Sequence, residues 1–550
     1  MYQQPEREHN YSRERMRREL LQKSYKAERQ KRAKQHKSHM GIVITILVVL
    51  ILIAGGILVK LWLDTNPFRV PGEITYDESL TEDEKAYIEE RYSKYVETYD
   101  FELWHDVKIS AKTSYKNEND LQNNIVAYDI ELPTVDFYSS ELNITSAEAE
   151  TDKVTWISLA KITPENRVVS IDNNYWFDTL DEGAKYRFII IESKDDETAK
   201  RFTTFVSKAF ASDKTNEDGK LEMGSDFPFG KEEYLSFAQT GVTALTRAMT
   251  NTLNGRANGR GSYFADNIKD FLSSKDLTHI SNEVSFTDGC KGGTNTMSLC
   301  ADWRSLDTIT AIGTDIVELT GNHNNNYGTS ANVKTIEKYH ELGMKTFGGG
   351  VNEDEAAKPL QIAEKGQHIT LLGYNESTST KGNGELANGS KPGANGYTEA
   401  KAKADIAAAK ERGDFIIVDI QFAECYSYPD GYTEMPACDK PIAGQQKFFR
   451  QFIDWGVDMV IGTQAHHPQT FEYYKGKPIY YGLGNLFFDQ TYWPGTQRGY
   501  ILTHYFYNNQ LLNTRISPTW YDAKHQVYLT NESTSESFIK RLVNASPEGK

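Results

Sequence analysis

Basic charge, cysteine and internal repetition are all scarce in this chain of 550 residues. Its 61 Lys and Arg stand against 77 Asp and Glu, which gives a formal net charge of −16. An acidic surface repels polyanions, and this argues against nucleic acid and anionic lipid as partners. The absence of a repeat argues against a solenoid or a propeller. Aromatic residues, at 12%, are sufficient for packed cores, and the length leaves room for more than one domain.

Only four cysteines are present, which limits the disulfide pattern to a few choices. They are Cys290, Cys300, Cys425 and Cys438. Four cysteines allow three complete pairings, and closeness in sequence favours Cys290–Cys300 together with Cys425–Cys438. Four free thiols are the alternative, which an oxidising compartment would disfavour. The sequence therefore predicts two local disulfides.

The first sixty residues differ in charge and hydropathy from the rest of the chain. Residues 1–40 carry a net charge of +7, so the remainder carries −23, and the run from Gly41 to Val59 has no charge at all. A run of this length matches a helix that crosses a bilayer, and the preceding basic residues place the N-terminus in the cytoplasm. A buried core helix is the alternative; a cleaved signal peptide fits the long charged leader poorly. We therefore expect a single-pass protein of the cell membrane, anchored through residues 41–63, with extracellular C-terminal domains.

Composition and periodicity divide the chain into six predicted parts. The sequence from Ser79 to Glu84 has the pattern of a helix start, and strand-type and helix-type segments alternate from about residue 236 to 489, as in an α/β domain with a buried sheet. No residue of the smaller domain indicates catalysis. The parts are a cytoplasmic basic segment (1–40), the transmembrane helix (41–63), a small membrane-proximal α/β domain (64–211), a linker (212–235), a larger α/β domain (236–500) and a C-terminal extension of strands and a helix (501–550).

Polar residues of the kind that bind metals stand where the predicted strands of the larger domain end, which is where α/β folds place their chemistry. Six motifs carry them: GVTALTR (241–247), SNEVSF (281–286), TGNHNNNYG (320–328), QFAECYSYP (421–429), GTQAHHPQ (462–469) and GLGNLFFDQ (482–490). In this order they resemble the CapA family of poly-γ-glutamate capsule proteins, a branch of the metallophosphoesterase-like superfamily. The resemblance covers residues 237–490. It implies an α/β/β/α sandwich of two mixed sheets with helices outside and a site in the loops after the strands.

Four positions that the resemblance assigns to a metal site or to catalysis carry neutral side chains. Val242 stands where the family has an acid, Asn326 replaces an Asp, and two glutamines replace histidines at Gln421 and Gln464. Two neighbouring dications repel each other unless a carboxylate or hydroxide bridges them, and they also need nitrogen or carboxylate ligands. We therefore expect that the dinuclear centre is lost, and that the protein holds one divalent ion (Mn, Fe or Zn) or none.

The remaining candidates follow from the same motifs. As metal ligands we expect Glu283, Asn322, His323 and His466; as catalytic groups Glu283, Glu424 and His323; as substrate contacts Tyr426 and Asn485. Each has an ordinary alternative. His323 suits a structural turn, Glu283 a helix cap or surface charge, and Glu424 a position fixed by the adjacent disulfide. Asn485 is also suited to stabilising its own turn, and His467, beside His466, to packing or facing solvent.

Three functions are compatible with these residues. By resemblance, the protein is expected to take part in the biosynthesis or export of poly-γ-glutamate or a similar cell-surface polymer, with that polymer and membrane proteins as partners. A single metal would polarise the scissile carbonyl or phosphoryl, with Glu283 or Glu424 as general base. The strong negative charge opposes a polyanion, because no basic cluster accompanies the motifs. A non-catalytic binding or scaffold protein of the cell envelope is the alternative, and an active phosphoesterase is the third.

Overall fold

The computed structural model describes residues 53, 72–99, 106–114, 125–180, 182–193, 234–293, 299–376, 385–422 and 436–547. Segment 41–63, predicted to cross the membrane, lies outside this set except for Ile53. Among the described helices, none is long and apolar enough to cross a bilayer; the 18-residue α2 (Glu82–Tyr99), for instance, is rich in charged residues. This finding contradicts the predicted localisation as a single-pass membrane protein with extracellular domains, and the transmembrane part of the predicted fold is unsupported.

Residues Ile74–Phe101 and Val107–Lys550 group into one compact unit, whose first part is a small, mostly antiparallel sheet. The strand order is β1-β2-β8-β3-β5, with β6 beside β3. Helix α2 begins with a capping box, because the Thr81 N–H donates to Glu84 Oε2 (2.7 Å) and the Glu84 N–H donates to Thr81 Oγ1 (3.2 Å). This confirms the helix start predicted there. The elements are β1 (Ile74–Tyr76), β2 (Val107–Ser114), β3 (Ile125–Asp136), β4 (Asn143–Ile144), β5 (Thr155–Ser158), β6 (Asn166–Val168), β7 (Ser170–Ile171), α3 (Trp176–Thr179) and β8 (Lys185–Ser193).

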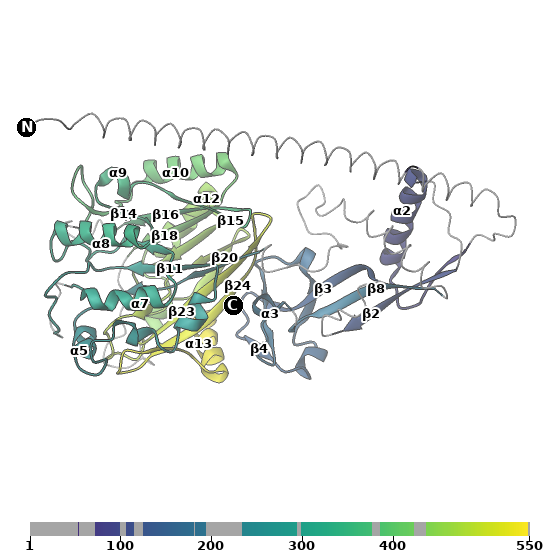
Figure 1. The fold of residues 1–550 in the computed structure, drawn as a ribbon, viewed down its shortest axis with the longest axis horizontal. Helices are drawn as coiled ribbons and strands as arrows, with labels where there is room; N and C mark the ends of the chain where they lie inside the picture. The colour runs from purple at the N-terminus through teal and green to yellow at the C-terminus, as the bar shows by residue number, and fades with distance from the viewer. Residues whose placement is uncertain are drawn as a thin grey trace, which may run out of the picture. The chain divides into compact units, whose positions relative to one another are not determined.

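A nine-stranded mixed sheet follows in the larger domain (Figure 1). Its order is β13-β12-β11-β9-β23-β24-β25, and the short strand β10 joins β11 to β22. The strands are β9 (Leu235–Gln239), β10 (Val242–Thr243), β11 (Leu277–Asn282), β12 (Ile316–Glu318), β13 (Lys345–Phe347), β22 (Asn485–Phe487), β23 (Arg498–Tyr507), β24 (Gln510–Tyr521) and β25 (Val527–Leu529). Its helices are α5 (Ala248–Asn254), α6 (Lys269–Ser273), α7 (Leu306–Ala311), α8 (Thr329–Glu341) and α13 (Glu532–Asn544).

A six-stranded sheet with the order β15-β16-β18-β19-β21-β20 completes the larger domain. Its central strands, from β16 to β21, pair in parallel, and hairpins close both edges. The elements are β14 (Gly349–Gly350), α9 (Glu353–Ala356), β15 (Leu360–Glu364), β16 (Gln367–Asn375), β17 (Gly393–Ala394), α10 (Glu399–Arg412), β18 (Phe415–Gln421), α11 (Pro436–Asp439), α12 (Gln445–Trp455), β19 (Met459–Gly462), β20 (Phe471–Tyr474) and β21 (Lys477–Tyr480).

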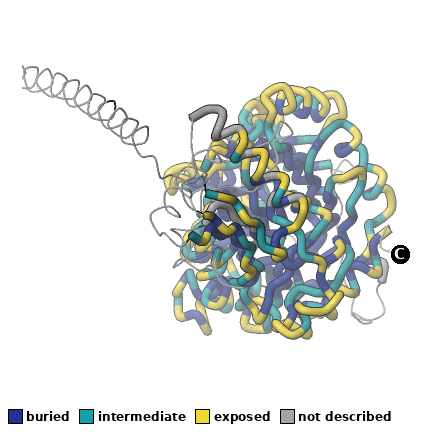
Figure 2. Tube along the Cα trace, turned by 90° about the vertical axis from the view of Figure 1, so that its right-hand side faces the viewer, coloured by how far each residue is buried: buried dark blue, intermediate teal, exposed yellow. Residues whose placement is uncertain are grey.

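Three apolar layers show that the two large sheets pack face to face with helices outside. Between the sheets, Phe237 and Ile316 of one meet Ile417 and Met459 of the other. A second cluster joins the outer face of the nine-stranded sheet to α5, α7 and α8, and a third joins the six-stranded sheet to α10 and α12. Figure 2 shows the buried interior as dark blue tube beneath an exposed outer shell. The architecture is thus mixed α/β with two sheets, as the sequence predicts.

Alternation along the strands decides which polar residues lie between the sheets. In β18, Ile417 faces the space between the sheets, whereas Ile416 and Val418 face the helices. Because side chains alternate along a strand, Asp419 and Gln421 share the face of Ile417. Asp419 therefore lies deep between the sheets, and Gln421 lies where the strand ends. The boundaries predicted for the domains are not tested by these contacts and stay predictions.

Candidate functional site at the strand ends

The loops after β10, β11 and β12 meet at one edge of the nine-stranded sheet. The strand β10 lies between two others, with Val242 opposite Ser281 of β11 and opposite Asn485 of β22. Just beyond β11, Val284 forms a bridge with His323 of the loop after β12. Motifs far apart in the sequence thus become neighbours at this edge.

Gln421 of the six-stranded sheet connects this edge with the loop that precedes His466. The Gln421 amide Nε2, at the end of β18, donates to Asn322 Oδ1 (3.0 Å) and also to Gln464 Oε1 in the loop after β19. Asn322 is next to His323, and Gln464 is two residues before His466, so the loops that carry the two histidines are joined through amide groups. Gln421 and Gln464, 2% and 3% exposed, are held together inside the protein, at positions where the family resemblance implies metal-binding histidines.

His323 is oriented by an amide oxygen. Its Nδ1 lies 2.8 Å from Asn326 Oδ1. The same oxygen accepts the main-chain N–H of Leu299 (2.9 Å), and the Asn326 amide nitrogen donates to Glu385 Oε1 (2.9 Å), so the oxygen and nitrogen of this amide are distinguished. His323 Nδ1 is therefore the donor, and in the neutral ring the lone pair is on Nε2. Asn326, in place of the family's Asp, has become a positioning residue.

His466 is oriented in the same way by Asn485. Its Nδ1 lies 2.9 Å from Asn485 Oδ1, and the Asn485 amide nitrogen donates to the carbonyl oxygen of Thr496 (3.0 Å). His466 Nδ1 is thus also a donor, with the ring lone pair on Nε2. Asn485 is only 2% exposed, and its amide is bonded within the protein to His466, Thr496, Gln490 and Tyr521. Its predicted contact with a substrate stays a prediction.

Glu283 lies at the same edge, inside the protein. It is 1% exposed, and its N–H donates to the carbonyl oxygen of Thr243 (3.0 Å). A Cβ added to Gly321 would lie 2.7 Å from Glu283 Cα, so glycine is required for the close approach of the loop after β12. Glu283 is therefore not a surface charge. Its predicted roles as ligand and general base stay predictions.

Two further polar residues of the motifs form ion pairs or hydrogen bonds with other parts of the protein. His467 Nε2 lies 2.9 Å from Asp439 Oδ1, and Asp439 Oδ2 accepts from Arg541 Nε (2.6 Å). His467 is fully buried in this group. Of the two positions expected for it, packing inside the protein is confirmed and exposure to solvent is wrong. Asp489 binds the Arg247 guanidinium and accepts the Ala248 N–H (3.0 Å), so it anchors the start of α5.

Several predicted residues lie beyond the part of the chain that the structure describes. They are Glu424, Cys425 and Tyr426. The predicted roles of Glu424 as a catalytic group and of Tyr426 as a substrate contact therefore stay predictions.

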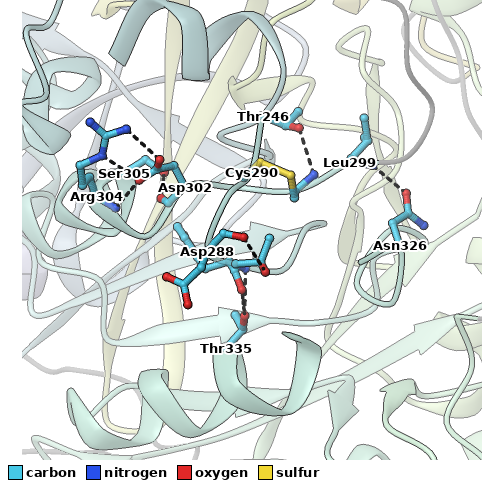
Figure 3. The surroundings of a disulfide bond; sticks show 12 residues. Thr246, Asp288, Cys290, Leu299, Asp302, Arg304, Ser305, Asn326 and Thr335 are labelled. Atoms are coloured by element: carbon cyan, nitrogen blue, oxygen red, sulfur yellow. Dashed lines mark hydrogen bonds and ion pairs between the residues drawn. A yellow bond between two sulfur atoms is a disulfide. The ribbon is translucent and has the colours of Figure 1, made fainter. Parts of the chain in front are cut away.

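One predicted disulfide is confirmed, and it lies beside the site. Cys290 and Cys300 are bonded, and the loop that they close is held by the Cys300 N–H on Thr246 Oγ1 (3.2 Å) and by the Leu299 N–H on Asn326 (Figure 3). Cys438 is also disulfide-bonded, as predicted. The Cys290–Cys300 loop thus supports the amide that orients His323.

The donors at the strand ends do not fit two divalent ions. Among the described side chains, no three His, Cys, Asp or Glu residues gather into a group that would hold a metal. Within the described residues, the edge has the imidazoles of His323 and His466, the carboxylates of Glu283 and Glu385 and several neutral amides, and no carboxylate stands at position 242 or 326 to bridge two cations. The predicted single Mn, Fe or Zn ion stays a prediction.

Sequence reasoning missed a group of ionisable side chains below the site. Gln239, His279, Glu318, Asp419 and His504 are all buried, at 1% exposure or less. His279 Nε2 lies 3.4 Å from Asp419 Oδ2, and the Gln239 amide nitrogen donates to the same carboxylate (3.3 Å). Burial raises the pKa of Asp419 well above its usual value, with the Glu318 charge as a second cause, and burial also raises the pKa of Glu318. Burial lowers the pKa of His279 and that of His504 to about 3. The signal in the sequence was a histidine or an acid inside a buried strand, such as the Asp in FIIVDIQ (415–421).

The sequence of this α/β domain is similar to those of known proteins. A family model described as "Bacterial capsule synthesis protein PGA_cap" matches residues 236–490. The capsule biosynthesis protein CapA of Bacillus anthracis is 24% identical over 215 residues, which is 38% of this chain and 49% of the relative. The PGA biosynthesis protein CapA of Bacillus subtilis is 22% identical over 241 residues, 44% and 60% of the two chains.

A third relative is a probable polyglutamine synthesis accessory protein of Mycobacterium tuberculosis. It is 26% identical over 193 residues, which is 33% of this chain and 47% of the relative. The chain therefore spans about half the length of the curated relatives it matches. Residues 236–490, somewhat less than half of the chain, are therefore similar to the capsule synthesis proteins of the CapA family.

Proposed function

We propose that this protein is an accessory factor in the synthesis of a poly-γ-glutamate type of polymer, and that its strand-end site binds the polymer chain. The names of the relatives, which refer to capsule, PGA and polyglutamine synthesis, support the process. The hydrogen-bonded amides of Gln421, Gln464 and Asn322, set between the loops of two oriented histidines, support the binding role. That the larger domain is related to the metallophosphoesterase-like superfamily is part of the same proposal.

Neutral amides suit this ligand better than they suit a phosphate ester. A phosphoryl group needs cations or metal ions to balance its charge, and the nearest motif arginine, Arg247, is already paired with Asp489. A γ-linked glutamate chain contains one amide per residue. Side-chain amides can donate to its carbonyl oxygens and accept from its N–H groups without opposing its carboxylates. The imidazole rings, with their lone pairs on Nε2, add acceptor capacity.

This proposal predicts binding without hydrolysis. Poly-γ-glutamate of defined length, titrated into the full chain by calorimetry, is expected to bind, with no release of glutamate or shorter chains. Gln421→Ala removes the amide that links the two loops. At about 0.5–1.5 kcal/mol for each hydrogen bond that Gln421 would make to the polymer, its removal weakens binding by about tenfold.

A matched control is available in a second glutamine pair. Gln445 of α12 and Gln469 exchange amide hydrogen bonds of 3.0 and 3.1 Å, so Gln445→Ala removes the same chemistry from another place. We expect polymer affinity to be retained in this variant. Equal losses in both variants, or no binding by the unmodified chain, would show that the strand-end amides do not bind the polymer.

A further inference from the structure

A cavity of about 200 Å³ lies between the small domain and the last strands of the larger domain. From the small domain, Arg167 and Ser170 line it; from β24, Arg515 and Ser517 do so. None of these residues belongs to the motifs at the strand ends. Two arginines and two hydroxyls at one cavity form a positive, hydrogen-bond-donating wall.

Arg167 carries a buried charge that the described chain does not neutralise. Its residue exposure is 4%. Its Nη2 donates to the carbonyl oxygens of Ser139 and Glu141 (3.1 Å for the second), whereas its Nε is buried without a hydrogen-bond partner. No carboxylate among the described residues forms an ion pair with it, although Asp136 and Glu141 are near enough to favour its charge. Burial lowers the pKa of Arg167 to about 10, so the guanidinium is still charged at neutral pH. A buried charge is costly unless an anion accompanies it.

The second arginine is fixed in place by the protein. Arg515 pairs with Asp178, which also receives Lys275 Nζ at 2.7 Å, and the Arg515 guanidinium lies 4.5 Å from the centre of the Tyr175 ring. The carboxylate of Asp178 thus pairs with two cations, Arg515 and Lys275, and neutralises only one of their two positive charges. The cavity wall formed by Arg167 and Arg515 therefore keeps an excess of positive charge. Arg515 contributes to the field in the cavity without being free to move into it.

Two serines add neutral donors on opposite walls. Ser170 and Ser517 are 4% and 7% exposed. Within the described part of the chain, neither hydroxyl makes a hydrogen bond, although both line the cavity. Glu532 lies at the same cavity, where it accepts from the Asn143 amide (2.9 Å). Its negative charge disfavours a ligand with two negative charges on one group.

We propose that this cavity binds a small organic carboxylate, with the carboxyl group on Arg167 and hydrogen bonds from Ser170 and Ser517. One carboxylate matches the single uncompensated guanidinium in charge, and it can accept from the guanidinium donors that the two Nη2 bonds leave open. A phosphate dianion would bring a second negative charge next to Glu532. This site is separate from the strand-end site and does not depend on the function proposed for it.

The test uses the full chain with the monoanion monomethyl glutarate, called glutarate below, and, separately, inorganic phosphate as probes in calorimetric titrations. We expect saturable binding of glutarate and weaker binding of phosphate. Arg167→Lys keeps the charge but removes the guanidinium donors, and is expected to weaken glutarate binding about tenfold. Ser517→Leu fills the cavity from β24, and it is expected to abolish binding while thermal unfolding shows a folded protein. This second variant keeps the test decisive if Arg167→Lys is unstable.

Arg304→Lys is the matched control, because Arg304 is an exposed arginine paired with Asp302; it should bind glutarate as the unmodified chain does. No saturable binding of glutarate up to about 10 mM, a level that corresponds to less than about 3 kcal/mol of binding free energy, overturns the proposal. Tighter binding of phosphate than of glutarate, or unchanged binding by a folded Ser517→Leu, also overturns it. Poly-γ-glutamate binding should survive in Ser517→Leu, which separates this result from the strand-end site.

Discussion

Two pairs of histidines in the larger domain have the same chemistry and opposite surroundings. His323 and His466 lie in loops just after strands, and each donates from Nδ1 to an asparagine oxygen. His279 and His504 lie inside β11 and β23, between the two sheets, and burial lowers the pKa of each to about 3. The first pair is oriented by amides. The second pair is held neutral by the lack of solvent.

Position relative to the strand end thus distinguishes the two pairs. The histidines in the loops after strands are candidate binding groups, and the histidines inside strands set the pH dependence of stability. The two kinds of buried ionisable groups act in opposite directions. His279 and His504 are neutral when folded and titrate near 6.5 when unfolded, so the stability that they contribute is present above pH 6.5 and is lost as pH falls toward 3. Asp419 has a raised pKa, so its contribution decreases as pH rises from about 4 toward that higher pKa.

The largest effect is expected from the disulfide beside the first pair. Replacing Cys290 and Cys300 by serine removes the constraint on a loop with a sequence separation of 10. Loop-closure entropy puts the loss of stability at about 3 kcal/mol. Because Leu299 of this loop supports Asn326, polymer binding should also weaken, whereas the response of the interior pair to pH should not change. Denaturant unfolding at two pH values measures the loss of stability and its response to pH, and calorimetric titration measures polymer binding. An altered pH response would show that the two regions are coupled.

The interior pair is tested by His504→Gln, a neutral replacement of similar size. Between pH 7 and pH 5 the unfolded imidazole gains a proton and the folded one does not, which is worth about 2 kcal/mol. The stability of the variant relative to the unmodified protein should therefore rise by about that amount as pH falls from 7 to 5. Urea unfolding at both pH values measures it, with the exposed His368 changed to Gln as the control. A difference that is independent of pH would mean that His504 takes up its proton over the same pH range in the folded and the unfolded protein, and would contradict this account.

The smallest effect is expected at the strand-end pair. His323→Gln removes the ring and its lone pair while leaving most of the volume, and polymer affinity should fall about tenfold, or about 1.4 kcal/mol, with little change in melting temperature. His340→Gln, at an exposed histidine of α8, is the control. A large loss of stability together with normal affinity would reverse the assignment of the two pairs, because His323 would then be the structural histidine.

Much of the fold could be predicted because local patterns and tertiary structure agree. The capping residues Thr81 and Glu84 gave the start of α2, and alternating strands and helices gave the mixed α/β architecture. The strand-end loops were predictable for the same reason, since consecutive strands of parallel sheets present their ends at one edge. Proximity in sequence was also sufficient to predict the Cys290–Cys300 disulfide.

The remainder depended on which way side chains point. Adjacent in sequence, His466 and His467 lie in different environments, because one meets Asn485 and the other Asp439. The inward direction of Asp419 follows from strand phase only when the partner sheet is known. Arg167 gave no signal at all, because the cavity that it lines is formed by segments more than 300 residues apart in sequence.

The central claim is that the strand-end site binds a polymer through amides and imidazoles rather than through a pair of metal ions. The most direct measurement compares poly-γ-glutamate binding by the full chain before and after exhaustive treatment with a chelator, with metal analysis of the same samples. We expect the same affinity in both samples, and fewer than two ions for each chain before treatment. Two bound ions for each chain, with binding that is lost on chelation and restored by Mn²⁺ or Zn²⁺, would contradict this account.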